Sequence, residues 1–471
     1  MAIFAALLTS SAMFTSCGDD DTNNTLPNND PVIPVTPDEG EAMSPADQKE
    51  RLETVALDFM AQTPSSDFDA IGNLADYIKD TYVDDYDWDN VGDWAEDIFD
   101  AARQALGTTT TETEAEHYGD SSYEYNSIYT NYKAVLMASN FTGHFTARNG
   151  RWELSEADDL RFIFPDQNGQ ECVVRLETSG DVKQVYAFNV DDWMDYDYEN
   201  SGDTYISNDY YDRTQCTIGV PEHIVVTLTQ NNSQVVRTAI DIDLGSIQDE
   251  RFDISKNNLT LAVLVEANNG YRFNLSQVAY TANSKAAVSF EMSKNNSPLI
   301  TVATTADVHD IPSCNVDAFS SENFDPDDYD TDNTNANNAF VKVDVMGKVQ
   351  IQGTLSDVRK FVDYIEDADD NSSNESLYKS YLNQANGLAD VNLFYDNTST
   401  KQATVSLEPF IDESWSGSTY WTMEPVLNFY DGSSYSTFEA FFNDDDFKSV
   451  IDTFKTLSNR YADLVGEHID W

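Results

Sequence analysis

Residues 259–292, LTLAVLVEANNGYRFNLSQVAYTANSKAAVSFEM, decide the fold class. Apolar side chains occupy every second position from Leu259 to Val265 and again from Val288 to Met292. This period of two is typical of β-strands, in which successive side chains point to opposite faces. Asn268-Asn269-Gly270 separates two of the runs, and Asn-Gly favours a tight hairpin turn. The stretch therefore predicts consecutive antiparallel strands joined by polar turns.

The same pattern extends in both directions and predicts an antiparallel β meander over residues 123–318. Asn149-Gly150 and Asn168-Gly169 mark earlier hairpin turns. Ala262 and Leu264 place apolar side chains on the second face as well. We therefore expect another part of the chain to cover that face.

A helical unit is predicted before the meander, over residues 45–107. Ser44 is a suitable N-cap and Pro45 suits the first helical position. Apolar spacing predicts two further helices, over residues 71–82 and 93–106. The polar Thr/Glu run at 108–116 is expected to separate this unit from the meander.

Residues 339–471 predict a mixed α+β region. Helices are expected at 355–368 and 375–386, and strands at 391–395, 404–407, 423–430 and 434–442. A last helix, 444–466, carries the stripe Phe447, Val450, Ile451, Phe454, Leu457, Tyr461 and Leu464. The whole chain is predicted to be α+β. The two β regions could form one sheet or two.

The charge of the chain excludes some partners. It has 84 acidic and 26 basic residues, for a net charge of −58. Such a surface repels phosphate backbones, so nucleic-acid binding is not expected. The chain has four cysteines, Cys17, Cys172, Cys216 and Cys314. If Cys17 carries lipid, as argued below, the other three can form one disulfide at most.

The N-terminal residues have the features of an export signal. Residues 2–14 form an apolar stretch that is too short to span a bilayer as a helix. Ser16-Cys17 and the acidic residues 19–21 follow it, and in this respect the segment resembles the signals of Bacteroidetes-type lipoproteins. The resemblance implies cleavage after residue 16, lipid on Cys17 and display on the outer membrane. Residues 17–44 are rich in Pro, Asn, Asp and Thr and lack periodicity, so we expect them to be a disordered spacer. No other stretch is long and apolar enough to be a transmembrane helix, so the lipid would be the only membrane anchor.

One acidic segment has the spacing of a calcium-binding loop. From Asp85 to Glu96, oxygen ligands fall at positions 1, 3, 5, 7, 9 and 12 of an EF-hand-like loop, namely Asp85, Asp87, Asp89, Val91, Asp93 and Glu96. Asn90 stands where glycine makes the sharp turn. The competing interpretation is an acidic loop in which Asp93 caps the next helix. We therefore expect no cofactor, with calcium as the alternative.

A second segment, residues 191–212, combines carboxylates with aromatic rings. Rings stack on sugar C–H groups while carboxylates accept from hydroxyls, so the segment is a candidate glycan-binding loop. Its aromatic residues are Trp193, Tyr196, Tyr198, Tyr205, Tyr210 and Tyr211. The competing interpretation is a loop with its rings packed against the sheet.

Catalytic motifs are missing from the sequence. The five histidines are scattered, and no nucleophile elbow, phosphate-binding loop or zinc motif occurs. The favoured hypothesis is a non-enzymatic surface or periplasmic lipoprotein that binds a glycan or a protein. The alternatives are a carrier of an apolar ligand in a curved-sheet cavity and a glycan hydrolase with paired carboxylates.

Overall fold

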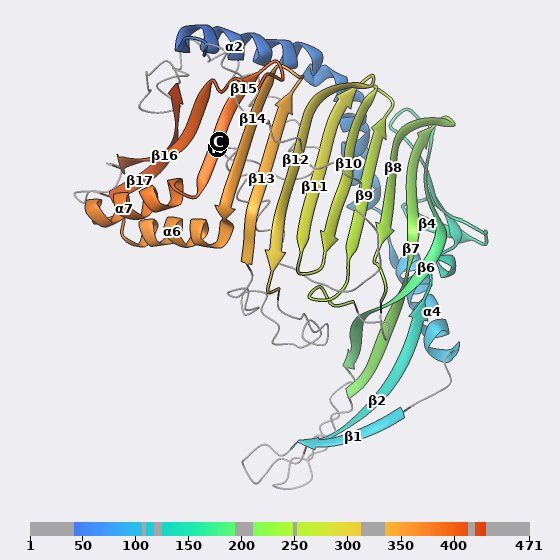
Figure 1. The fold of residues 1–471 in the computed structure, drawn as a ribbon. Coiled ribbons are helices and arrows are strands. Elements are labelled where there is room, and N and C mark those ends of the chain that lie inside the picture. Colours follow the sequence, from blue (N-terminus) through green and yellow to red (C-terminus); the bar gives the residue numbers. More distant parts are fainter. Residues whose placement is uncertain are drawn as a thin grey trace.

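The computed structural model describes residues 42–105, 110–116, 125–193, 211–247, 252–311, 335–412 and 420–429. Within these residues the protein is α+β and consists mostly of sheet (Figure 1). All seventeen strands of the described residues join one sheet. The strands before residue 200 are β1 (Thr110–Glu116), β2 (Tyr125–Leu136), β3 (Gly143–Arg148), β4 (Arg151–Ser155), β5 (Leu160–Pro165) and β6 (Glu171–Trp193).

The later strands form the body of the sheet. They are β7 (Tyr211–Gln230), β8 (Ser233–Asp243), β9 (Leu259–Ala267), β10 (Tyr271–Thr281), β11 (Lys285–Lys294), β12 (Ser297–His309), β13 (Asn335–Val345), β14 (Val349–Asp357), β15 (Ala389–Tyr395), β16 (Ala403–Asp412) and β17 (Tyr420–Phe429). From β5 to β17 each strand pairs antiparallel with the next in the chain. Because β12 pairs with β13, the two predicted β regions share one sheet.

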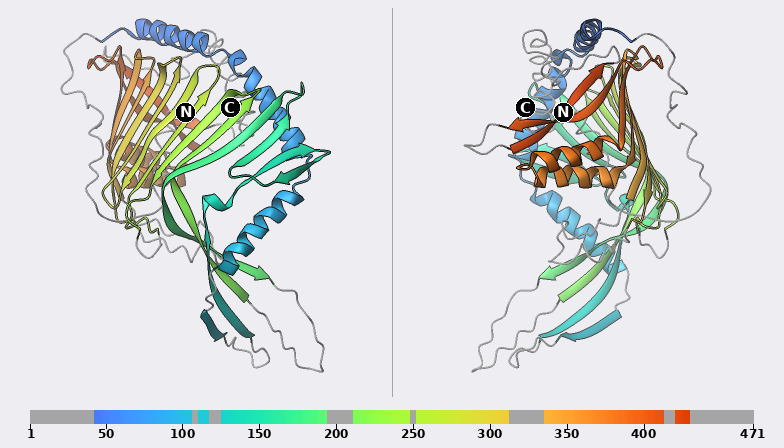
Figure 2. Two further views of the ribbon diagram at one scale, coloured as in Figure 1. Left: turned by 90° about the vertical axis from the view of Figure 1, so that its right-hand side faces the viewer. Right: turned by 60° about the vertical axis from the view of Figure 1, so that its left-hand side comes forward.

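The early strands extend this meander and make it a mixed sheet. β3 pairs parallel with β5 and antiparallel with β4. β2 pairs parallel with β7, and β1 pairs with β2. Together with the ends of β6 and β7, β1 and β2 project away from the body of the sheet (Figures 1 and 2).

The predicted turns are found where the Asn-Gly sequences stand. Asn149 and Gly150 both have positive φ, as a type I′ hairpin turn requires, and Gly270 has φ +87°. The Thr/Glu run, however, is not a separator, because residues 110–116 form strand β1. Its threonines are β-branched and favour extended backbone, and β2 supplies the partner strand.

The described residues contain five α-helices: α2 (Pro45–Gln62), α3 (Asp69–Ile78), α4 (Asp89–Ala105), α6 (Val358–Asp370) and α7 (Glu375–Asn386). Ser44 caps α2 as predicted, since its side chain accepts a hydrogen bond from the Asp47 N–H. Helix α7 has the predicted bounds, whereas α6 begins three residues later than expected. The delay follows from Asp357, which ends β14 and caps α6.

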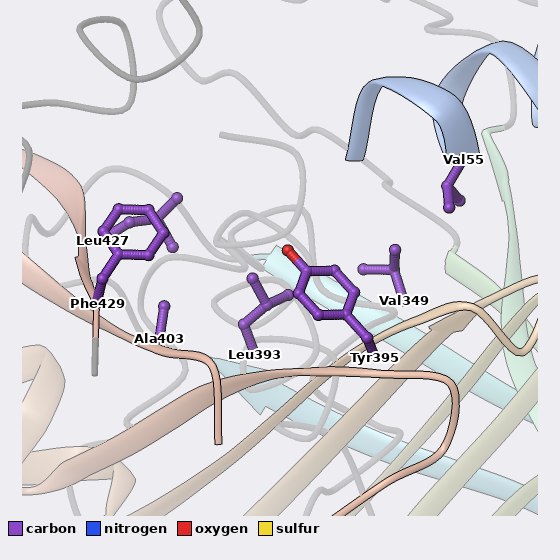
Figure 3. Packing of buried hydrophobic residues seen from close by; sticks show 7 residues of the cluster. All are labelled: Val55, Val349, Leu393, Tyr395, Ala403, Leu427 and Phe429. Atoms are coloured by element: carbon purple, nitrogen blue, oxygen red, sulfur yellow. The ribbon is translucent and has the colours of Figure 1, made fainter. Parts of the chain in front are cut away.

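All five helices pack on the same face of the sheet, here called the inner face. Val55 of α2 belongs to a buried cluster with residues of β14–β17 (Figure 3). Leu74 of α3 and Trp94 of α4 pack with residues of β3–β8, and α6 and α7 pack near β14–β17. Figure 2 shows the sheet curving around these helices.

The opposite, outer face is polar over much of its width. Leu264 of β9 lies on this face, but the positions that follow it across the sheet are Asn274, Glu291, Thr301 and Asp344. The apolar pattern on both sides of β9 therefore does not continue through the neighbouring strands. The hydrophobic clusters of the described residues lie on the inner face, although Phe340, Phe394 and Val426 are buried on the outer face. The strand predicted at 434–442 and the helix predicted at 444–466 lie outside the described residues.

Candidate functional site

The strand register lines up apolar side chains in rows across the inner face. Val263 is paired with Leu275, Leu275 with Phe290, Phe290 with Val302, and Val302 with Val343. Paired residues of neighbouring strands point to the same side of a sheet. These five strands therefore present one continuous apolar row.

A second row lies two residues away from the first on each strand, and three residues away on β10, where the register shifts at a bulge. Leu261 is paired with Val278, Val278 with Val288, Val288 with Thr304, and Thr304 with Val341. Three residues of the two rows are covered: Phe290 packs in a hydrophobic cluster, and Thr304 and Val341 are buried. The other seven are here called the central patch, made of Leu261, Val263, Leu275, Val278, Val288, Val302 and Val343. All seven of its side chains are half-buried.

Buried clusters lie over the two ends of the strands rather than over the central patch. One buried cluster lies over one end of β10–β12, around Tyr271, Met292 and Leu299. Another lies at the opposite end, around Tyr280 and Val308. None of the hydrophobic clusters formed among the described residues includes a residue of the central patch.

Charge is missing from both rows as they continue to the last strand. The first row runs through Ile351, Leu393, Ala403 and Phe429, and the second through Gly353, Val391, Val405 and Leu427. Six of these eight residues on β14–β17 belong to the buried cluster around Val55, so the part of the rows that is only half-buried is the central patch. It suits the binding of an apolar molecule or segment.

The outer face has a row of basic residues instead. His144, Arg161 and Arg175 lie side by side in the register of β3, β5 and β6. Asp159 accepts from all three, with distances of 2.7 Å to His144 Nε2, 2.8 Å to an Arg161 guanidinium nitrogen and 2.9 Å to Arg175 Nε. These bonds, that of His144 first, hold the pKa of Asp159 far below its usual range. The charges are paired within the protein, so this row is structural.

One further arrangement contains the residue types of a catalytic triad. Ser179, His223 and Asp241 lie directly opposite one another on β6, β7 and β8, and His223 Nδ1 is 2.7 Å from Asp241 Oδ1. The side chains of His223 and Asp241 are 50% and 63% exposed. Nucleophilic catalysis also needs a hydrogen bond from the serine to the imidazole and a site that excludes water. An open sheet face does not offer the second of these, so the arrangement does not support a hydrolase.

The candidate calcium ligands are divided between a loop and a helix. Asp85 and Asp87 precede α4, whereas the segment from Asp89 to Glu96 lies inside it. Asp87 Oδ1 accepts from the Asp89 N–H at 2.9 Å. Asp93 therefore lies within α4 and does not cap it. A helix spaces its residues along an axis and does not wrap an ion as an EF-hand loop does.

No group of three or more His, Cys, Asp or Glu side chains in the part of the chain that the structure describes could hold a metal ion. Calcium binding at Asp85, Asp87, Asp89, Val91, Asp93 and Glu96 stays a prediction.

The predicted glycan loop is described only at its two ends. Trp193 and Tyr211 are paired at the ends of β6 and β7, where they close a long hairpin. Tyr196, Tyr198, Tyr205 and Tyr210 lie outside the described residues, as does Cys17. Glycan binding and lipidation therefore stay predictions.

The structure restricts disulfide pairing. Cys172 is free and buried, and burial raises the pKa of its thiol. It pairs in register with Gln230, whereas Cys216 pairs with Phe188, sixteen residues further along β6. At about 3.3 Å per residue this separation is far beyond the reach of a disulfide. Cys172 and Cys216 therefore do not bridge.

Comparison with known proteins gives no relative: no family model, curated protein or solved structure matches this chain. Among the described residues, no helix has the length and apolar character needed to cross a membrane. The interpretation of function therefore depends on the residues themselves.

Proposed function

We propose that this chain is a non-enzymatic binding protein that holds an apolar ligand against the central patch. The observation that supports the proposal is the uncharged central patch on the inner face, which is half-buried and lies between two buried clusters at the ends of the strands. Aliphatic surface of this kind binds acyl chains or other apolar groups through the hydrophobic effect. Because the protein is strongly acidic, the expected ligand has a neutral or cationic head group.

We also propose that the protein acts in the cell envelope as a lipoprotein, anchored through lipid on Cys17. The lipoprotein-like residues around Ser16-Cys17 support this location. Mass spectrometry of the native protein tests it directly. An acylated N-terminal Cys17 is expected, and an unmodified cysteine or an uncleaved leader would contradict it.

Binding of the neutral fluorescent dye Nile red tests the proposed ligand site. Val302→Asp places a carboxylate in the middle of the central patch and is expected to weaken dye binding at least tenfold. The matched control is Ala303→Asp, since Ala303 is the next residue and lies on the outer face beside Lys342. Circular dichroism and urea unfolding of both variants check that the fold is retained. Equal dye binding by the two variants would exclude the central patch as the site.

A further inference from the structure

The two apolar rows continue beyond the central patch to β7. In the first row Val263 is paired with Ile240, and Ile240 with Ile224. In the second row Leu261 is paired with Ile242. The three isoleucines are half-buried, and none of the hydrophobic clusters formed among the described residues includes them. The half-buried apolar surface, here called the apolar band, therefore runs across the strands from β7 to β13.

The shape of the apolar band favours a narrow ligand. Its two rows are about 7 Å apart along the strands, and the buried clusters around Tyr271 and Tyr280 border it on the two sides. Because apolar contact extends to about 4 Å, one hydrocarbon chain that lies between the rows contacts both of them. A second chain beside the first would lie over a buried cluster instead. The band therefore suits a single chain that lies across the strands.

Glu222 brings a carboxylate to the β7 end of the apolar band. It is half-buried and lies two residues from Ile224, so it is on the same face of the sheet. His223 is paired with Asp241, and one further step in this register places Glu222 beside Ile242. The second row of apolar side chains therefore ends at a negative charge.

A β-bulge in β6 holds the Glu222 side chain. The register of β6 and β7 shifts between Ser179 and Val182. Glu222 Oε2 accepts a hydrogen bond from the Asp181 N–H at 3.1 Å. A Cβ at Gly180 would lie 2.8 Å from both Cβ and Oε2 of Glu222, so the glycine leaves room for the carboxylate. Bulges of this kind direct a side chain to a particular place.

The neighbouring basic residue of β6 has other partners. Lys183 Nζ donates to Asp243 Oδ1 at 2.8 Å and to the backbone oxygen of Gly245. The bond from Lys183 holds the pKa of Asp243 below its ordinary value. Among the described residues no basic side chain forms an ion pair with Glu222. Its carboxylate is therefore able to pair with a cation from outside the protein.

We propose that the apolar band binds a single-chain lipid with a cationic head group, whose ammonium lies against Glu222. The inference rests on the proposed function, because it names the class of ligand for the same surface. From Glu222 on β7 to Val288 on β11 there are four strand spacings of about 4.8 Å, which is roughly 19 Å. With C–C bonds of about 1.5 Å, an extended chain advances about 1.3 Å per carbon, so about fifteen carbons cover this distance. Beyond Val288 the row continues into the buried Thr304, where the open surface ends.

Displacement of Nile red by alkyltrimethylammonium ions tests the head-group site. The full-length chain is used, at ion concentrations below those that form micelles. Glu222→Gln keeps an acceptor for the Asp181 N–H and removes the charge. It is expected to weaken hexadecyltrimethylammonium binding about fivefold, as the loss of a partly screened ion pair does, and to leave Nile red affinity unchanged. Glu291→Gln removes the same charge from the outer face and is expected to change neither affinity.

The length of the alkyl chain tests the apolar band. A fully buried CH₂ tightens binding about fourfold, so a half-buried one is expected to tighten it about twofold, from eight to sixteen carbons. Longer chains are expected to gain little, because the open surface has ended. An affinity that does not depend on chain length would contradict the inference.

The outcomes separate the inference from the proposed function. Equal effects of Glu222→Gln and Glu291→Gln on hexadecyltrimethylammonium binding would overturn the inference. The proposed function would then still stand if Val302→Asp weakened Nile red binding. If Val302→Asp left Nile red binding unchanged, the proposed function would fail and the inference with it. Urea unfolding of each variant checks that the fold is retained.

Discussion

The buried amide of Gln48 joins α2 to Tyr395 at the end of β15 and to Gln402, which precedes β16. Its side chain is fully buried, and its Nε2 donates to the backbone oxygens of Met43 at 3.0 Å and of Gln402 at 3.1 Å. Its Oε1 accepts from the Tyr395 hydroxyl at 3.3 Å. Burial raises the pKa of Tyr395, so this hydroxyl stays protonated and remains a donor. We predict that replacing Gln48 lowers the free energy of unfolding, and that this loss depends on pH when the new side chain can carry a charge.

Two substitutions of similar size separate the effects of hydrogen bonding and charge. Gln48→Met removes the bonds and leaves buried oxygens without a donor, which is expected to cost about 2–5 kcal/mol at any pH, since each unsatisfied group costs about 1–3 kcal/mol. Gln48→Glu keeps an acceptor for Tyr395 but points a second carboxylate oxygen at two carbonyl oxygens. Burial and these neighbours are expected to raise the pKa of the new carboxyl above its ordinary value.

The sign of the pH dependence follows from this raised pKa. Below the pKa of the unfolded chain, near 4.3, the carboxyl is protonated in both states and the Gln48→Glu variant is at its most stable. As the pH rises toward the folded-state pKa, the folded state binds more protons than the unfolded state. Stability then falls by up to about 1.4 kcal/mol per pH unit.

Urea unfolding followed by tryptophan fluorescence at pH 5 and pH 7.5 measures both effects, with Gln48→Met as the control for pH. A Gln48→Glu variant that loses the same free energy of unfolding at the two pH values would refute the reasoning. So would a loss below 1 kcal/mol for Gln48→Met, because the buried bonds would then contribute little.

Three further predictions concern other parts of the molecule. Asp159→Asn is expected to lower the free energy of unfolding by about 1–3 kcal/mol at pH 7. Because the pKa of Asp159 is depressed, the loss should shrink as the pH falls below about 4, which acid titration of unfolding measures. Gly270→Ala is expected to cost about 1–3 kcal/mol, because φ is +87° and the new Cβ would meet the Asn295 side chain, while an unchanged urea midpoint would contradict this. If calcium binds between Asp85 and Glu96, it is expected to raise the melting temperature, and an unchanged melting temperature would contradict the site and agree with the helical segment Asp89 to Glu96.

Local patterns in the sequence were sufficient to predict many elements of the fold. Ser44-Pro45 marks the start of α2, and the period-two runs around residues 259–292 mark β9–β11. These signals are local because caps, turns and alternation depend on neighbours in the chain. Strand β1 was missed because its Thr/Glu composition looks solvated, although β2 is available to pair with it.

The central patch could not be predicted, because it depends on the pairing of strands that are distant in the sequence. Val302 and Val343 are 41 residues apart and meet only through the register of β12 and β13. In a strand a shift of one residue would turn a side chain to the other face. Gln48 was missed for a similar reason, since its partner Gln402 is 354 residues away. A buried glutamine leaves no periodic signal.

A sheet of a single layer links the stability of this protein to its binding surface. The outer face is polar over much of its width, and the hydrophobic clusters that include helix residues lie on the inner face. The strands between these clusters are held by backbone pairing and by half-buried aliphatic side chains such as Val302. An apolar group that covers these side chains would bury their exposed surface. Each Å² of apolar surface buried in this way stabilises the folded state by about 25 cal/mol. Because the central patch is only half-buried, an apolar ligand that binds there is expected to stabilise the middle of the sheet more than its ends.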